Sequence, residues 1–181
     1  MDKIILIKYA ELMTKKGNIN YFINCLYKNI NTKLKGLNVN IKRELTRMFI
    51  EFDDKDLDVI IDKLKHIFGI HAIVIGYKIN TDLETIKDKS LELINKETFK
   101  TFKVETKRSY KKFEPNSLEI NKIVGSYLLD NLNDKKVDVH HPDILLNIEI
   151  RKDNSYIYVN EIKGLGGYPV GIQGKGLVML S

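Results

Sequence analysis

The alternation of apolar and polar residues in the first third of the chain predicts four strands and two helices. Apolar residues recur every three or four positions in two stretches, which end at Gly36 and Gly69, and this spacing is typical of helices with one buried face. Short apolar runs and period-two alternation, as in Met48, Ile50 and Phe52, are typical of strands. In chain order the expected elements are strand 3–8, helix 19–34, strands 39–43 and 47–52, helix 57–67 and strand 70–77.

This order, β-α-β-β-α-β, is that of a ferredoxin-like domain, which we expect to end near Gly76. The rest of the chain predicts a second α/β domain. Helical spacing runs from Asp82 to Ile94, and Asn116 with Glu119 three residues later is a capping-box pattern that opens another helix. No disordered linker separates the domains, so we expect an α+β protein whose two domains pack together. Further strands are expected at 99–105, 137–139, 144–150 and 156–162.

The composition changes at Gly164. Six of the eleven glycines lie between Gly164 and Gly176. Glycine clusters allow a close backbone approach to a partner, and they also form linkers. The apolar residues that follow, up to Ser181, are typical of a buried strand that has just begun, which suggests a chain cut from a longer protein. The expected divisions are a first domain at 1–76, a second domain at 77–163, and a glycine-rich junction with the first strand of a missing domain at 164–181.

The overall composition indicates a soluble globular protein. Of 181 residues, 43% are hydrophobic and 30% are charged, and the mean hydropathy is -0.24. The apolar runs are as short as strands, far below the roughly 20 residues of a membrane helix, and the N-terminus has no signal-peptide pattern. Cys25 is the only cysteine, which excludes an internal disulfide and a cysteine-rich zinc site. We expect a cytoplasmic protein with no membrane partner.

Positive charge is concentrated in two parts of a chain whose net charge is only +6. Residues 1–50 contain ten basic and three acidic side chains, and residues 100–113 contain six basic and one acidic. Two separated basic stretches favour a groove that binds a polyanion. A solvated lysine-rich surface explains the charge equally well.

Catalytic and metal-binding patterns are not evident. His140 and His141 are adjacent, and adjacent residues of a strand point to opposite faces. Cys25 falls on an apolar helix face, where a structural thiol is expected. The chain has neither a GxxxxGK[ST] phosphate loop nor a GxSxG nucleophile motif. We therefore expect no metal and no catalytic residues in this chain.

The loop at 107–113 (KRSYKKF) has the composition of an RNA contact. Its four cations can bind phosphates, and Tyr110 and Phe113 offer rings on which unpaired bases can stack. The alternative is a solvated loop in which Phe113 is anchored in the core.

In the second domain, one set of residues matches a known pattern: 102–108 (FKVETKR), 112–113, 117–120 (SLEI), Gly125, 137–138, 142–143 and 166–171 (GGYPVG). This set resembles the THUMP domain, an RNA-binding module of tRNA-modifying enzymes. In the first domain, the matching residues are Tyr9, Glu11, 16–18 (KGN), Phe22, Arg47 and 68–70 (FGI). They are similar to the ferredoxin-like domain that precedes THUMP in the bacterial tRNA 4-thiouridine synthetases, also called thiamine-biosynthesis sulfurtransferases. The chain departs from the family pattern at Ile19 (commonly Arg), Thr46 (commonly Gly), Tyr110 (commonly Asp) and Glu114, in a slightly longer turn.

The resemblance covers essentially the whole chain and implies that it stops at the first serine of an ATP-binding pyrophosphatase loop. The intact family enzyme uses ATP, with Mg²⁺, to adenylate a uridine of tRNA and then installs sulfur from a cysteine persulfide, which also serves thiamine biosynthesis. A cysteine desulfurase is the implied sulfur donor, and family members tend to be homodimers. Met179 and Leu180 would form half of the ATP site. Because the adenylating loop and the sulfur-carrying cysteine lie beyond Ser181, we expect this fragment to catalyse nothing.

The resemblance implies that the fragment docks the acceptor stem and the single-stranded 3′ end of tRNA in a basic groove, largely by shape. Residues 166–171 are expected to shape the junction between the domains. The expected RNA contacts are Lys103, Lys107, Arg108, Lys111 and Lys112 in the second domain and Lys8, Lys15, Lys16 and Arg47 in the first.

Three alternative functions are also compatible with the sequence. The THUMP module could serve another tRNA modification, such as methylation, in which case a methyltransferase domain would follow. A ferredoxin-like domain could bind a metal or a small ligand without affinity for RNA. A structural dimerisation module would self-associate whether or not RNA is present.

Overall fold

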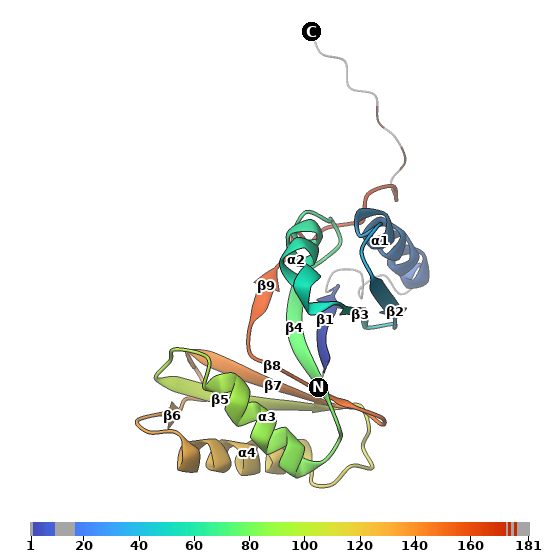
Figure 1. Ribbon diagram of the computed structural model, residues 1–181. Helices are drawn as coiled ribbons and strands as arrows, with labels where there is room; N and C mark the ends of the chain where they lie inside the picture. Colours follow the sequence, from blue (N-terminus) through green and yellow to red (C-terminus); the bar gives the residue numbers. More distant parts are fainter. Residues whose placement is uncertain (1, 10–16, 173, 175, 177–181) are drawn as a thin grey trace. The chain divides into compact units, whose positions relative to one another are not determined.

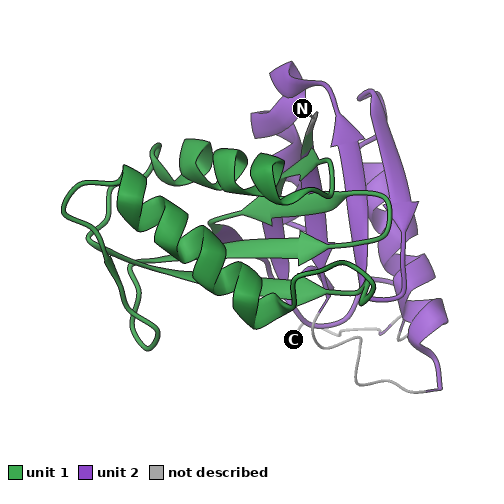
Figure 2. Ribbon diagram, turned by 90° about the horizontal axis from the view of Figure 1, so that it is seen from below, with its two compact units in different colours: residues 1–3, 75–160 green, residues 4–74, 161–181 purple. Residues whose placement is uncertain are grey.

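The computed structural model describes residues 2–9, 17–172, 174 and 176, and the chain divides into two compact units (Figures 1 and 2). Unit 1 comprises residues 1–3 and 75–160, and unit 2 comprises residues 4–74 and 161–181. Unit 2 is therefore built from two separate segments of the chain, and most of unit 1 is inserted between them.

Unit 2 has the predicted order of strands and helices. Its strands follow the order β2-β3-β1-β4, and β9 also pairs with β4. The elements are β1 (Asp2–Lys8), α1 (Ile19–Lys33), β2 (Val39–Arg43), β3 (Arg47–Phe52), a 3-10 turn (Asp54–Asp56), α2 (Leu57–Lys65), the first residues of β4 (Ala72–Ile79) and β9 (Glu161–Lys163).

The apolar periodicity of the sequence explains the core of unit 2. The predicted hairpin pairs Ile41 with Ile50 in an antiparallel register, and Ile50 in turn faces Ile5 of β1. The helical repeats place Leu26 of α1 and Leu64 of α2 fully inside. Burial of such side chains contributes about 1.5–3 kcal/mol each.

Unit 1 is a sheet with the strand order β4-β8-β7-β5-β6. The neighbours β7 and β6 both run parallel to β5, whereas β8 is antiparallel to β4 and to β7. In Figure 1 both helices of unit 1 lie on the same face of this sheet. The elements are α3 (Leu83–Ile94), β5 (Thr101–Arg108), α4 (Ser117–Asn131), β6 (Lys136–Val137), β7 (Ile144–Ile150) and β8 (Ser155–Tyr158), with the remainder of β4.

The core of unit 1 lies between the helices and the sheet. Phe102 of β5, Ile86 of α3 and Val124 of α4 are fully buried members of one apolar cluster. Alternation along β5 directs Phe102, Val104 and Thr106 inward, so the residues between them lie on the other face. No helix among the described residues is long and apolar enough to cross a membrane.

Three predicted strands differ from the observed ones. The strand expected at 99–105 is β5 at Thr101–Arg108, so the first two residues of the loop expected at 107–113 belong to the strand. The single strand expected at 156–162 is two strands, because β8 pairs with the end of β4 (Tyr77–Ile79) and β9 pairs with its beginning (Ala72–Val74). The strand expected at 137–139 ends at Val137, because the next residue, Asp138, accepts hydrogen bonds from two backbone amides and turns the chain.

Candidate nucleic-acid interface

Strand β5 of unit 1 positions two of the predicted cations. Its alternation places Lys103, Glu105 and Lys107 on the face opposite the buried residues. The ammonium of Lys107 lies 3.4 Å from a carboxylate oxygen of Glu105, and the Lys107 side chain is 63% exposed. A pair this exposed contributes little to stability, so Lys107 can exchange Glu105 for a phosphate at small cost.

Arg108 ends β5 and holds the loop that follows. Its guanidinium Nη1 donates to the carbonyl oxygens of Phe113 and Pro115, the latter at 3.2 Å. Ser109 contributes a second attachment, because its backbone N–H and its hydroxyl both donate to the carbonyl of Ile150. Arg108 therefore fixes the shape of the basic loop through its bonds to the loop backbone. Direct contact between Arg108 and RNA stays a prediction.

The loop itself presents the predicted lysines. Lys111 and Lys112 are exposed, whereas Tyr110 is half-buried. Phe113 packs against the apolar core of unit 1. The ring of Phe113 therefore anchors the loop, which is the structural alternative considered for this residue.

The predicted capping box fixes the start of α4, directly after the basic loop. Asn116 Oδ1 accepts from the backbone N–H groups of Leu118 (3.0 Å) and Glu119 (3.2 Å), and Glu119 Oε2 accepts from the backbone N–H of Asn116 (2.9 Å). The cap holds Leu118 at the first turn, where its side chain is 70% exposed.

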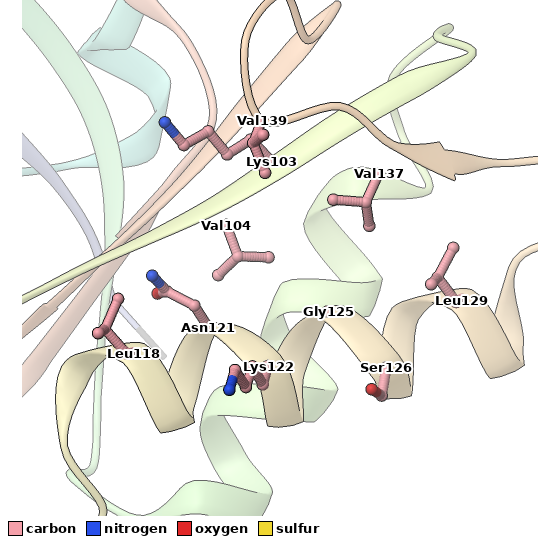
Figure 3. Close-up of a pocket in the computed structure, with 10 residues that line it drawn as sticks. All are labelled: Lys103, Val104, Leu118, Asn121, Lys122, Gly125, Ser126, Leu129, Val137 and Val139. Carbon is pink, nitrogen blue, oxygen red and sulfur yellow. The ribbon is translucent and has the colours of Figure 1, made fainter.

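A groove of about 440 Å³ lies between β5 and α4 (Figure 3). Figure 3 shows Val104, Leu118 and Leu129 around this space, with Lys103 and Lys122 at its border. Gly125 has no side chain and leaves the middle of the helix open to the groove. The lining residues are Lys103, Val104, Leu118, Asn121, Lys122, Gly125, Ser126, Leu129, Val137 and Val139.

Two carboxylates hold the loop that forms the far wall of the groove. Asp138 accepts from the backbone N–H groups of His141 and His140, and these bonds lower the pKa of Asp138 below its usual value. Asp143 accepts from the backbone N–H groups of Thr101 and Lys100 at 2.9 Å each, which lowers its pKa in the same way. The described part of the chain has no group of three or more His, Cys, Asp or Glu that could hold a metal.

The other predicted contacts belong to unit 2 or lie outside the described residues. Lys8 of β1 faces Arg47 of β3 in the strand register, and Lys8 also forms an ion pair with Glu161. Lys15 and Lys16, proposed for RNA, and Met179 and Leu180, proposed for ATP, lie outside the described residues.

Sequence reasoning missed the α4 side of the groove. Leu118 and Leu129 lie off the buried stripe of α4, which is formed by Ile120, Val124 and Leu128. Apolar residues on the solvent side of a helix were the available signal. These two residues line a groove only because the fold brings Val137 and Val139 next to them, and the sequence alone does not show this.

Comparison with known proteins identifies both domains. Residues 4–74 match the ThiI ferredoxin-like domain, and residues 80–160 match the THUMP domain. The chain is therefore a THUMP-domain protein with a ferredoxin-like domain of the ThiI type, which confirms the predicted fold class.

Its relatives specify the family further. The chain is 42% identical to the probable tRNA sulfurtransferase of Acholeplasma laidlawii, with 100% of this chain and 44% of that protein covered. It is also 42% identical to the probable tRNA sulfurtransferase of Bacillus licheniformis, with 99% and 46% covered. The chain is thus similar to the ferredoxin-like and THUMP region of proteins named probable tRNA sulfurtransferases, and it spans about 45% of the length of these relatives.

Solved structures agree with this assignment. A 4-thiouridine synthetase, solved as an RNA complex with bound ATP, is 33% identical with a TM-score of 0.80, over 94% of this chain and 44% of that one. PH1313 from Pyrococcus horikoshii is 30% identical with a TM-score of 0.82, over 93% and 57%. TrmN from Thermus thermophilus, at 16% identity and a TM-score of 0.60, shares the fold alone.

Proposed function

We propose that this chain is the tRNA-docking region of a tRNA 4-thiouridine sulfurtransferase and that the groove between β5 and α4 takes the unpaired 3′ end. The observation that carries the proposal is an open apolar groove with lysines at its border, on the domain that matches THUMP. The similar 4-thiouridine synthetase was solved bound to RNA, which supports a nucleic acid as the ligand.

The chemistry of the groove suits a single strand. Unpaired bases expose flat apolar faces that pack on side chains such as Leu118, Val137 and Val139, and the backbone phosphates need cations at the border. Lys103 and Lys122, which are among the lining residues, are proposed for that second task. A duplex cannot enter, because its bases are stacked inside.

The basic loop adds a second contact. Lys111 and Lys112 are exposed, and Lys107 precedes them on β5, so these three cations are available for the phosphates of the acceptor stem. Arg108 supports them through its bonds to the loop carbonyls. Lys8, Lys15, Lys16 and Arg47 are proposed as further contacts from unit 2.

The chemical steps are proposed to belong to the remaining half of a longer protein. The resemblance implies ATP with Mg²⁺, a cysteine desulfurase as sulfur donor, a second role in thiamine biosynthesis and a homodimer. Uridine adenylation and sulfur transfer then need residues beyond those present here. The 181-residue chain alone is expected to bind tRNA without modifying it. A role in another tRNA-modifying enzyme, such as a methyltransferase, has less support, because the relatives at 42% identity are named probable tRNA sulfurtransferases.

Binding to an acceptor-stem RNA, measured in a salt series with and without its 3′ overhang, tests this proposal. We expect an affinity that falls steeply with salt and that drops when the overhang is removed. Matched duplex DNA is the control ligand. Equal affinity for RNA with and without the overhang would contradict the role of the groove.

A pair of matched variants localises the binding. Leu118→Asp places a negative charge in the groove at an exposed position, and Val59→Asp makes the same kind of change at an exposed position of unit 2. The first variant is expected to lose affinity only for RNA that carries the overhang, and the second is expected to bind like the original chain.

A further inference from the structure

The glycine-rich segment at 164–171, here called the strap, is a fixed part of unit 2. Its first half is joined by backbone hydrogen bonds to the residues that lead into β4. These bonds run from Gly164 N to His71 O (2.8 Å), from Gly166 N to Ile70 O (2.8 Å) and from Gly69 N to Gly166 O (2.7 Å). The strap therefore follows a defined path, unlike a flexible linker of the same composition.

The second half of the strap is attached to α1. The carbonyl of Val170 accepts from Cys25 Sγ (3.2 Å) and from Asn29 Nδ2 (3.1 Å). The ring of Tyr168 lies 5.5 Å from the ring of Phe22. These contacts place the strap across unit 2, between the turn before β4 and the helix.

A close fit holds the middle of the strap. Pro169 is buried, and a Cβ added at Gly69 would lie 2.7 Å from its Cγ. Gly69 also has a φ of +96°, which disfavours any other residue. Glycine at position 69 thus serves both the turn before β4 and the contact with the strap.

The fixed strap presents apolar side chains to solvent. The eleven residues between Lys163 and Lys175 include no charged side chain, although 30% of the whole chain is charged. Leu165 is 50% exposed and Val170 is 66% exposed. Phe68, which is 49% exposed, lies beside the strap, since its Cδ1 is 4.0 Å from the Cβ position of Gly167. An uncharged, preorganised apolar surface is typical of the centre of an interface.

We propose that the strap and Phe68 form the surface on which the remaining half of the longer protein packs. This inference rests on the proposed function, because it assumes a protein of the relatives' length. The length of the relatives that this chain leaves uncovered points to this occupant. The chain covers only 44% of the Acholeplasma laidlawii relative and 44% of the ATP-bound 4-thiouridine synthetase.

Hydroxyl-radical footprinting tests this proposal by comparing the 181-residue chain with the protein extended by the codons that follow Ser181. In the extended protein, labelling of Phe68 and Tyr168 should fall by about fivefold, as expected for side chains that become the centre of an interface. Tyr21, an exposed residue of α1, is the internal control and should not change. Equal labelling of Phe68 in both proteins would overturn the proposal, as would a stop codon directly after Ser181.

Two variants of the extended protein separate packing from folding. Val170→Asp should restore labelling of Phe68, and Leu45→Asp, at another exposed apolar position of unit 2, should leave it low. If Phe68 is already protected in the 181-residue chain, and this protection disappears when the chain is diluted, the surface binds a second copy of the chain. That result would overturn the proposal. RNA binding by the 181-residue chain is measured separately, so a failure of the proposed function can be told apart from a failure of this packing proposal.

Discussion

The bonds made by Arg108 separate two roles within one basic cluster. Arg108 donates to two carbonyl oxygens of its own loop, whereas the neighbouring lysines at 111 and 112 are exposed. A sequence of cations that looks uniform thus contains one residue that shapes the loop and others that can meet phosphates. This difference leads to opposite expectations for stability and for salt dependence.

Lys112→Ala is expected to weaken RNA binding without changing stability. Loss of one phosphate contact should reduce the slope of log affinity against log salt concentration by about 1. Urea unfolding should be unchanged, because an exposed lysine contributes little to the fold. An unchanged salt slope, measured by fluorescence anisotropy, would remove Lys112 from the interface.

Arg108→Lys is expected to act through the fold. Lysine keeps the charge but cannot reproduce the two bonds of the guanidinium, so the free energy of unfolding should fall by about 1–2 kcal/mol. RNA affinity should fall with it, because the loop loses its shape. A variant that keeps its free energy of unfolding but loses RNA affinity would show instead that Arg108 contacts RNA directly.

At the scale of secondary-structure elements, the capping box links the basic loop to the groove. Asn116→Ala removes the acceptor for two backbone N–H groups at the start of α4. Urea unfolding should show a loss of about 1 kcal/mol. Asn133→Ala, at an exposed position after the same helix, is the control and should be neutral. Affinity for RNA with a 3′ overhang should also fall, since the first turn of α4 carries Leu118.

Helix α3 carries an acid-sensitive pairing. Hydrogen bonds from Lys89 and from Lys96 lower the pKa of the Glu92 carboxyl from its ordinary value of 4.5 to about 2. Because the pKa is lower in the folded protein, the stabilisation is complete above about pH 4.5. It is lost as the pH falls toward 2. Glu92→Gln should therefore be less stable than the original chain at pH 7, and the difference should narrow in acid. A gap between their urea midpoints that is the same at pH 7 and pH 2.5 would contradict this assignment.

The secondary-structure elements could be predicted from the sequence where they depend on residues close together in the chain. Apolar periodicity predicted the order of strands and helices, and the spacing of Asn116 and Glu119 predicted the capping box, because both depend on residues close in sequence. The division of the expected strand at 156–162 depends on where β4 passes between the units. No local pattern contains that information.

At the scale of the whole molecule, the candidate site combines local and long-range features. The cations of β5 and its loop were evident from composition. The groove was not, because Leu118 and Leu129 are joined by Val137 and Val139 only through the parallel pairing of β5 with β6. The strap was recognised as a change in composition, and its attachment to Asn29 spans 141 positions of sequence. The residues that carry charge were thus easier to predict than the shape that they surround.

The most direct test of the account is methyl NMR of the 181-residue chain during titration with an acceptor-stem RNA that ends in an unpaired 3′ strand. If the groove takes the unpaired 3′ end, the methyl signals of its lining residues Leu118, Leu129, Val137 and Val139 should shift together. The signal of Val59 in unit 2 should stay in place, and the shifts in the groove should vanish when the overhang is removed. Groove signals that do not move while RNA binds, or that move equally with a blunt duplex, would contradict this prediction.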